Sequence, residues 1–154
     1  MEITLFYFLQ ILAAYILADI FAAFYHLITD LGYNIPSQGR DFQNHHDKPL
    51  TMTFDLQPML IGIPFIIAGY FWLPWFLIPL GIFLSLAQIP HYYAHFLDKR
   101  PWVIKKLQNM EIILEPEAHD SHHSGNFDKD YCVLSGWNNW WINWLAARLQ
   151  RFKR

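Results

Sequence analysis

The sequence has a single cysteine, Cys132, and this excludes two frameworks that are common in small proteins. No disulfide can form within the chain, and no zinc site can be built on a CxxC motif. Charged residues are also scarce, at 16% of 154 positions, and the net charge of −2 gives no basic excess that would favour nucleic-acid binding. In their place the chain carries 54% hydrophobic and 18% aromatic residues, a composition typical of a membrane protein.

Two long stretches almost without charge predict membrane spans. Residues 3–28 are interrupted by Asp19 alone, and they are long enough to cross a hydrocarbon core of about 30 Å as a helix. Residues 57–97 contain no Lys, Arg, Asp or Glu, and as one helix they would be about 60 Å long. We therefore expect a hairpin that turns at Leu73-Pro74-Trp75, because proline disfavours helix in the preceding residue and starts a helix well. The spans are expected at about 3–28, 57–73 and 75–97.

The C-terminal third predicts helices that lie outside the bilayer core. Residues 101–114 have the pattern of an amphipathic helix that starts at Pro101. Residues 137–152 combine four tryptophans with basic residues, as in helices that lie in the membrane interface, although a packing helix of a soluble protein is the alternative. The fold class is therefore expected to be an all-α membrane protein. We expect one membrane-embedded domain over residues 1–154, with three spans, a helical cap and an interfacial helix.

The basic residues predict the topology. Every Lys and Arg lies either within residues 29–55 or beyond residue 97. The positive-inside rule then places both regions in the cytoplasm and the N-terminus outside. This topology brings all the histidines to the cytoplasmic face, although the rule was applied without reference to them. The eight histidines fall into four groups: His26; His45 and His46; His91 and His95; and His119, His122 and His123.

The spacing of these histidines is typical of metal ligands on helices. His91 and His95 are four residues apart, as are His26 and Asp30, so each pair shares a helix face. His119, His122 and His123 also fit one face. Asp19 lies two turns before His26, where we expect it to accept a hydrogen bond from a ligand imidazole; a polar contact between helices is the alternative.

Eight imidazoles and one carboxylate are enough for two metal centres. Imidazole with a carboxylate and open positions favours non-haem iron that activates O2. Zinc is the alternative, because imidazole suits zinc equally well, but the chain lacks an HExxH motif. Haem ligation would use only one or two of the histidines.

These residues also resemble the motifs of a known family. Asp19, His26 and Asp30 match D-x6-H-x3-D, and residues 42–49 match F-x2-HH-x2-P. Residues 88–95 match Q-x2-H-x3-H, and the triplet His119-x2-His122-His123 follows in family order, before Tyr131-Cys132 and Gly136-Trp137. The chain thus resembles, from Ala18 to about Asn138, the lipid desaturases that include plasmanylethanolamine desaturase, the CarF-type proteins and a plant chloroplast palmitate desaturase.

The resemblance implies a membrane enzyme with two iron ions. With its three expected spans the protein is an integral multi-pass membrane protein, in a bacterial inner membrane or the endoplasmic reticulum depending on its source. Such an enzyme uses O2 and two electrons to remove two hydrogens from an alkyl-ether or acyl chain of a phospholipid. The electrons come from a cytochrome b5-type or ferredoxin-type donor. In the ether case the product is the vinyl ether of a plasmalogen. The resemblance assigns as catalytic metal ligands His26, His45, His46, His91, His95, His119, His122 and His123, with Asp30 as a further ligand or a partner of one.

Three other functions remain open from the residues alone. A lipid hydroxylase could use a similar di-iron centre, because both reactions begin with hydrogen abstraction. A zinc-dependent lipid hydrolase and a non-catalytic metal-binding or haem-binding membrane protein are more distant alternatives. A homo-oligomer is compatible with three spans, but no residue argues for one.

Overall fold

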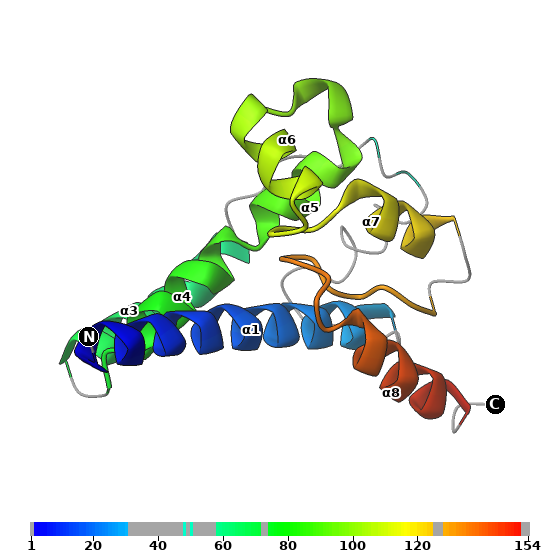
Figure 1. Ribbon diagram of the computed structural model, residues 1–154. Helices are drawn as coiled ribbons and strands as arrows, with labels where there is room; N and C mark the ends of the chain where they lie inside the picture. Colours follow the sequence, from blue (N-terminus) through cyan, green and yellow to red (C-terminus); the bar gives the residue numbers. More distant parts are fainter. Residues whose placement is uncertain are drawn as a thin grey trace.

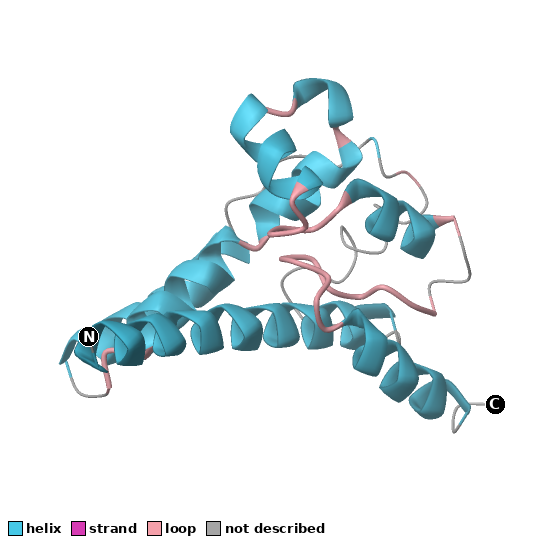
Figure 2. Cartoon of the chain, in the orientation of Figure 1, coloured by secondary structure: helices cyan, strands magenta, loops and turns pink. Residues whose placement is uncertain are grey.

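The computed structural model describes residues 2–30, 48, 50, 58–71, 74–124 and 128–151, and within these ranges it contains helices and no strand (Figure 2). The expected all-helical fold is thereby confirmed. His45 and His46 lie outside the described residues. The elements in chain order are α1 (Glu2–Asp30), η2 (Pro58–Gly62), α3 (Ile63–Phe71), α4 (Leu77–Leu86), α5 (Gln88–His95), η3 (Leu97–Lys99), α6 (Trp102–Asn109), α7 (Pro116–His123) and α8 (Asn139–Arg151).

Helix α1 is the long axis of the molecule. It runs for 29 residues without glycine or proline, about 43 Å at 1.5 Å per residue. Among the described residues it is the one helix long and apolar enough to cross a membrane. Large apolar side chains such as Ile3, Phe6 and Phe8 are exposed along its N-terminal half. An apolar surface of this extent needs lipid or a partner to cover it.

The expected hairpin is present, but its first arm is shorter than predicted. The turn at Pro74 is confirmed, because the amide of Leu77 donates to the carbonyl of Pro74 at 3.1 Å. Helix α3, however, has nine residues, about 14 Å, which is less than half of a hydrocarbon core. The second arm is divided at Ala87 into α4 and α5. The break lies one turn before Pro90, which has no amide hydrogen to donate to Leu86.

Two glycines explain how closely η2 and α4 approach each other. A Cβ atom on Gly81 would lie 2.5 Å from the carbonyl oxygen of Gly62, and one on Gly62 would lie 1.9 Å from that of Gly81. Neither position therefore accepts a side chain without moving a backbone. This contact fixes the position of α4, and α4 in turn packs along α1 through Leu80, Leu84 and the small residues Ala14 and Ala18.

The elements that carry the histidines gather at one end of the molecule. Figure 1 shows the N-terminal end of α1 beside α3, whereas α5, α7 and α8 lie towards the C-terminal end of α1. Residues 128–138, which carry no helix, run between α7 and α1 (orange in Figure 1). They contribute Val133 and Leu134 to one core cluster, and Tyr131 and Cys132 to a second one with Leu27 of α1.

Candidate metal centre

Four imidazoles from two helices converge on one point. His91 and His95 lie on α5, His119 and His123 lie on α7, and their ligand nitrogens all lie within 4.8 Å of one another. The Nε2 atom of His119 is 2.9 Å from that of His95 and 3.1 Å from that of His123. A neutral imidazole has one donor and one acceptor nitrogen, so several lone pairs aimed at one point fit a cation better than a hydrogen-bond network.

A second group lies beside the first and includes a carboxylate. It consists of His26 and Asp30 on α1 and His122 on α7, and its ligand atoms also lie within 4.8 Å of one another. The Oδ2 atom of Asp30 is 3.6 Å from Nε2 of His26 and 3.3 Å from Nε2 of His122. All three side chains are at least 95% buried. The expected pairing of His26 with Asp30 on one helix face is therefore seen.

Helix α7 connects the two groups. His119 and His123, four residues apart, face the first group, while His122 faces the second. The rings of His119 and His122 are 6.2 Å apart between centroids, and the rings of His26 and His91 are 6.0 Å apart. The histidine triplet, expected on one helix face, thus divides between two adjacent positions. A pair of ions held there would be near neighbours.

Burial keeps the central imidazole in the form that binds metals. The pKa of His119 lies well below its ordinary value, chiefly because burial removes water from the charged ring. The neighbouring imidazoles of His91, His95, His123 and His26 lower it further by repulsion in their charged forms. His119 is therefore neutral near pH 7 and presents a lone pair, as a metal ligand must.

Backbone carbonyls orient the two imidazoles of the second group. Nδ1 of His26 lies 3.1 Å from the carbonyl oxygen of Tyr131, and Nδ1 of His122 is bonded to the carbonyl oxygen of Lys129. A carbonyl can only accept, so both Nδ1 atoms must carry the hydrogen. Each Nε2 is then left with a lone pair directed at Asp30, the arrangement that a ligand imidazole usually has.

Asp19 has different partners from those expected. Its carboxylate accepts four hydrogen bonds, all from residues 134–138 and none of them from an imidazole. Oδ1 accepts the amides of Leu134 and Ser135, and Oδ2 accepts the Ser135 hydroxyl and Nδ2 of Asn138, at 2.9 to 3.2 Å. The reason is that residues 134–138 pass beside Asp19, and their amide and hydroxyl groups satisfy both oxygens of the carboxylate. The same segment, residues 128–138, carries the carbonyls of Tyr131 and Lys129 that bond His26 and His122.

Two further residues, Asn139 and Asn143 of α8, were not singled out from the sequence. Asn139 Oδ1 accepts the amide of Cys132 at 2.9 Å, and Asn143 Oδ1 accepts the amide of Asp130 at 2.7 Å. Their spacing of four residues on a tryptophan-rich helix was the available signal. The expectations for His45 and His46 concern residues outside the described ranges.

Comparison with known proteins identifies the family. The lipid desaturase domain matches residues 15–149, which is most of the chain. A probable fatty acid desaturase of Acanthamoeba polyphaga mimivirus is 28% identical over 150 residues, covering 88% of this chain and 75% of the viral protein. The chain belongs to the lipid desaturase family, whose members' names imply an oxidoreductase.

Two other relatives show the range of the family. The chloroplastic fatty acid desaturase 4 of Arabidopsis thaliana is 28% identical over 151 residues, covering 82% of this chain and 45% of the plant protein. The plasmanylethanolamine desaturase of Myxococcus xanthus is 27% identical over 150 residues, covering 84% of this chain and 53% of the bacterial protein. The chain thus spans about half the length of these two relatives. No solved structure matched the chain.

Proposed function

We propose that this protein is a membrane-bound di-iron desaturase that introduces a double bond into a phospholipid chain. The observation that carries the proposal is the pair of adjacent ligand groups that share α7, in a chain of the lipid desaturase family. Six imidazoles and one carboxylate, in two groups, are the ligand types that suit non-haem iron. Both the geometry and the donor set therefore fit two ions of this metal.

In this proposal His91, His95, His119 and His123 hold one iron, while His26, Asp30 and His122 hold the other. His45 and His46 are proposed as further ligands of the pair. When bound, two iron ions supply the O2 activation that breaks unactivated C–H bonds. The reduction of O2 to two water molecules requires four electrons. Two come from the C–H bonds that become the double bond, and two come from a cytochrome b5-type or ferredoxin-type donor.

The protein's own side chains hold the ligands in place and keep water away. His26, His91, His119 and His122 are at most 2% exposed. A dry site strengthens the interactions between charged groups and limits side reactions of a strong oxidant with solvent. The backbone bonds to His26 and His122 fix the ring orientation before any metal arrives, so little rearrangement is needed on binding.

We also propose a multi-pass topology in which α1 and the hairpin of α3 to α5 cross the bilayer. Tyr7, near the start of α1, has its ring centroid 4.8 Å from that of Trp75 in the hairpin turn, at the end of the molecule away from α5 and α7 (Figure 1). That placement is what three crossings require, with the ligand groups on the cytoplasmic side. Because α3 is short, its crossing would need residues beyond the helix itself. The membrane would be a bacterial inner membrane or the endoplasmic reticulum.

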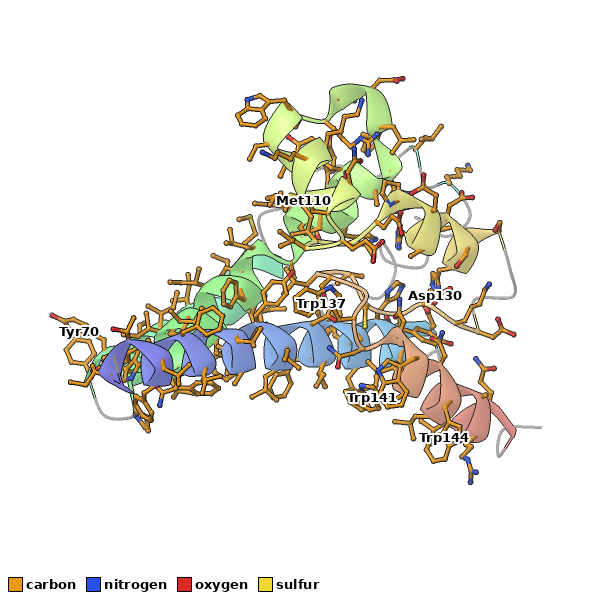
Figure 3. The ribbon with its side chains drawn as sticks, viewed as in Figure 1. Tyr70, Met110, Asp130, Trp137, Trp141 and Trp144 are labelled. Carbon is orange, nitrogen blue, oxygen red and sulfur yellow. The ribbon has the colours of Figure 1, made fainter. Side chains whose placement is uncertain are left out.

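Helix α8 is proposed to lie in the membrane interface. Its Ile142 and Ala146 are fully buried against the second core cluster, whereas Trp140 is 79% exposed. Trp144 points away from the rest of the chain (Figure 3), and the guanidinium of Arg148 lies 4.2 Å from its ring centroid. Tryptophan and arginine together are favoured where lipid headgroups meet acyl chains.

The substrate is proposed to be a phospholipid with either an alkyl-ether chain, giving a plasmalogen vinyl ether, or an acyl chain. The names of the relatives include both a plasmanylethanolamine desaturase and fatty acid desaturases, so both options are proposed. Mass spectrometry of membrane lipids, from cells with and without the protein, tests the proposal. A product lighter than its precursor by two hydrogens is expected. A product heavier by one oxygen would instead establish a hydroxylase.

A further inference from the structure

Helix α8 is connected to the second ligand group through two peptide units. The carbonyl of Tyr131 accepts a hydrogen bond from Nδ1 of His26. The amide of Cys132 belongs to the same peptide unit, and it donates a hydrogen bond to Oδ1 of Asn139. A trans peptide is planar, and its C=O and N–H point in opposite directions. A continuous chain of hydrogen bonds thus runs from Asn139 Oδ1 through one peptide unit to His26 Nδ1.

The same arrangement occurs one turn further along α8. The carbonyl of Lys129 accepts a hydrogen bond from Nδ1 of His122. The amide of Asp130 belongs to the same peptide unit, and it donates to Oδ1 of Asn143 at 2.7 Å. Asp130 itself is held from both sides, by Asn143 Nδ2 at 3.1 Å and by the hydroxyl of Ser121 on α7. Figure 3 shows Asp130 between α7 and α8.

We propose that Asn139 and Asn143 are positioning residues that set the metal affinity of the group formed by His26, Asp30 and His122. Each asparagine acts on one imidazole through one peptide unit. The inference rests on the proposed function, because it requires that this group binds a metal ion. It goes beyond that function by assigning to an interfacial helix the control of one of two metal positions.

Two physical effects support this role. First, an amide held at its N–H cannot rotate, so its carbonyl stays directed at the imidazole and each Nε2 stays directed at Asp30. Second, hydrogen bonds in a chain polarise one another, so an acceptor on the N–H makes the C=O a better acceptor for Nδ1–H. A stronger bond at Nδ1 makes the opposite nitrogen a better ligand.

The effect is expected to be selective. The bonds that Asn139 Oδ1 and Asn143 Oδ1 accept each lead through one peptide unit to His26 or His122. Asn143 Nδ2 also bonds Asp130, which the Ser121 hydroxyl of α7 bonds in turn, but in the described structure no bond of this path ends at an imidazole of the four-histidine group. Helix α5, which carries His91 and His95, packs instead against α7. Loss of the two asparagines should therefore weaken one metal position and leave the other unchanged.

The test is an anaerobic titration of the metal-free, detergent-solubilised full chain with ferrous iron. The variants are Asn139→Ala, Asn143→Ala and the double variant, with circular dichroism and thermal unfolding of each metal-free protein recorded beside the titration. The wild type is expected to bind two ions. In each single variant one affinity should fall about 10- to 100-fold, as for other partners of ligand imidazoles, while the other stays constant. The double variant should show the larger loss.

Tyr15→Phe is the matched control. It removes the hydrogen bond of the Tyr15 hydroxyl to the carbonyl of Ile112, a loop residue between α6 and α7 that lies outside residues 128–138. Both affinities should stay at the wild-type values. Asn139→Asp, which keeps the acceptor oxygen, should retain most of the affinity that Asn139→Ala loses. Because each asparagine serves a different imidazole, either single variant tests its own half of the proposal.

The outcomes separate the inference from the proposed function. Two unchanged affinities in folded variants would overturn the inference and leave the proposed function standing. Equal weakening of both positions would also overturn it, since that result indicates a general structural role. A wild-type chain that binds no iron would remove the proposed function, and the inference with it.

Discussion

The carboxylate of Asp30 lies 3.3 Å from Nε2 of His122, and this contact joins α1 to α7 at the buried end of the long helix. In a chain without a metal, a neutral imidazole and a carboxylate would gain little from this approach unless a proton or a cation lay between them. This contact is one reason why Asp30 is proposed as the carboxylate member of the second ligand group.

Replacing Asp30 tests that assignment. Asp30→Ala is expected to lower desaturase activity by at least about 100-fold, because a buried ligand is lost and not merely an outer partner. The measurement is product formation by isolated membranes, together with the iron content of the purified variant. Asp120→Ala is the control, since Asp120 is exposed on α7 and should leave both quantities unchanged. Full activity of Asp30→Ala would contradict the assignment.

The four-histidine group is tested on α7. His123→Ala removes one of four converging nitrogens and is expected to abolish product formation and to lower iron content. Product formation is measured by lipid analysis of cells that express the variant, and iron content by elemental analysis of the purified protein. The exposed neighbour Ser124 provides the control Ser124→Ala, which should behave as the wild type. Wild-type levels of the lipid product from His123→Ala would show that His123 is no catalytic ligand.

Asp19→Asn should weaken both stability and activity. Each carboxylate oxygen accepts two hydrogen bonds, so either orientation of the new amide turns its NH2 group towards two donors. Buried donors left without an acceptor cost about 1–3 kcal/mol of unfolding free energy. We expect a lower Tm, and reduced turnover at a temperature where the variant is still folded. Unchanged turnover would show that residues 134–138 do not transmit their position to His26.

Gly81→Ala tests the close contact in the hairpin. The added methyl would meet the backbone oxygen of Gly62 at 2.5 Å, so the arms must separate, at a cost of about 1–3 kcal/mol. Thermal unfolding in detergent should show the loss. The adjacent Ile82→Ala, at an exposed position, is expected to change the Tm little. Equal stability of Gly81→Ala and the wild type would contradict the observed packing.

Much of the fold was predictable because its signals are local. The apolar run of α1, the turn at Pro74 and the helical spacing of the histidines each depend on neighbouring residues, and the structure shows all three. The length of α3 was overestimated, because an apolar run does not reveal where a helix gives way to a 3-10 turn. The spacing and the charge rule together predicted that the candidate ligand residues would lie near one another, and the structure brings seven of them together in two groups.

What could not be predicted depends on contacts between distant segments. The partners of Asp19 lie more than a hundred residues away, and the donors are mostly backbone amides or small polar side chains, which no motif records. The division of the histidine triplet between two groups depends on how α7 is oriented against α1 and α5. The roles of Asn139 and Asn143 required the path of residues 128–138, which carry no helical periodicity.

The proposed function requires that two adjacent metal positions in this chain hold iron. Elemental analysis combined with Mössbauer spectroscopy of the purified protein tests it most directly. We expect two iron ions per chain, one at each ligand group. Two zinc ions without iron, or a single isolated iron, would contradict it.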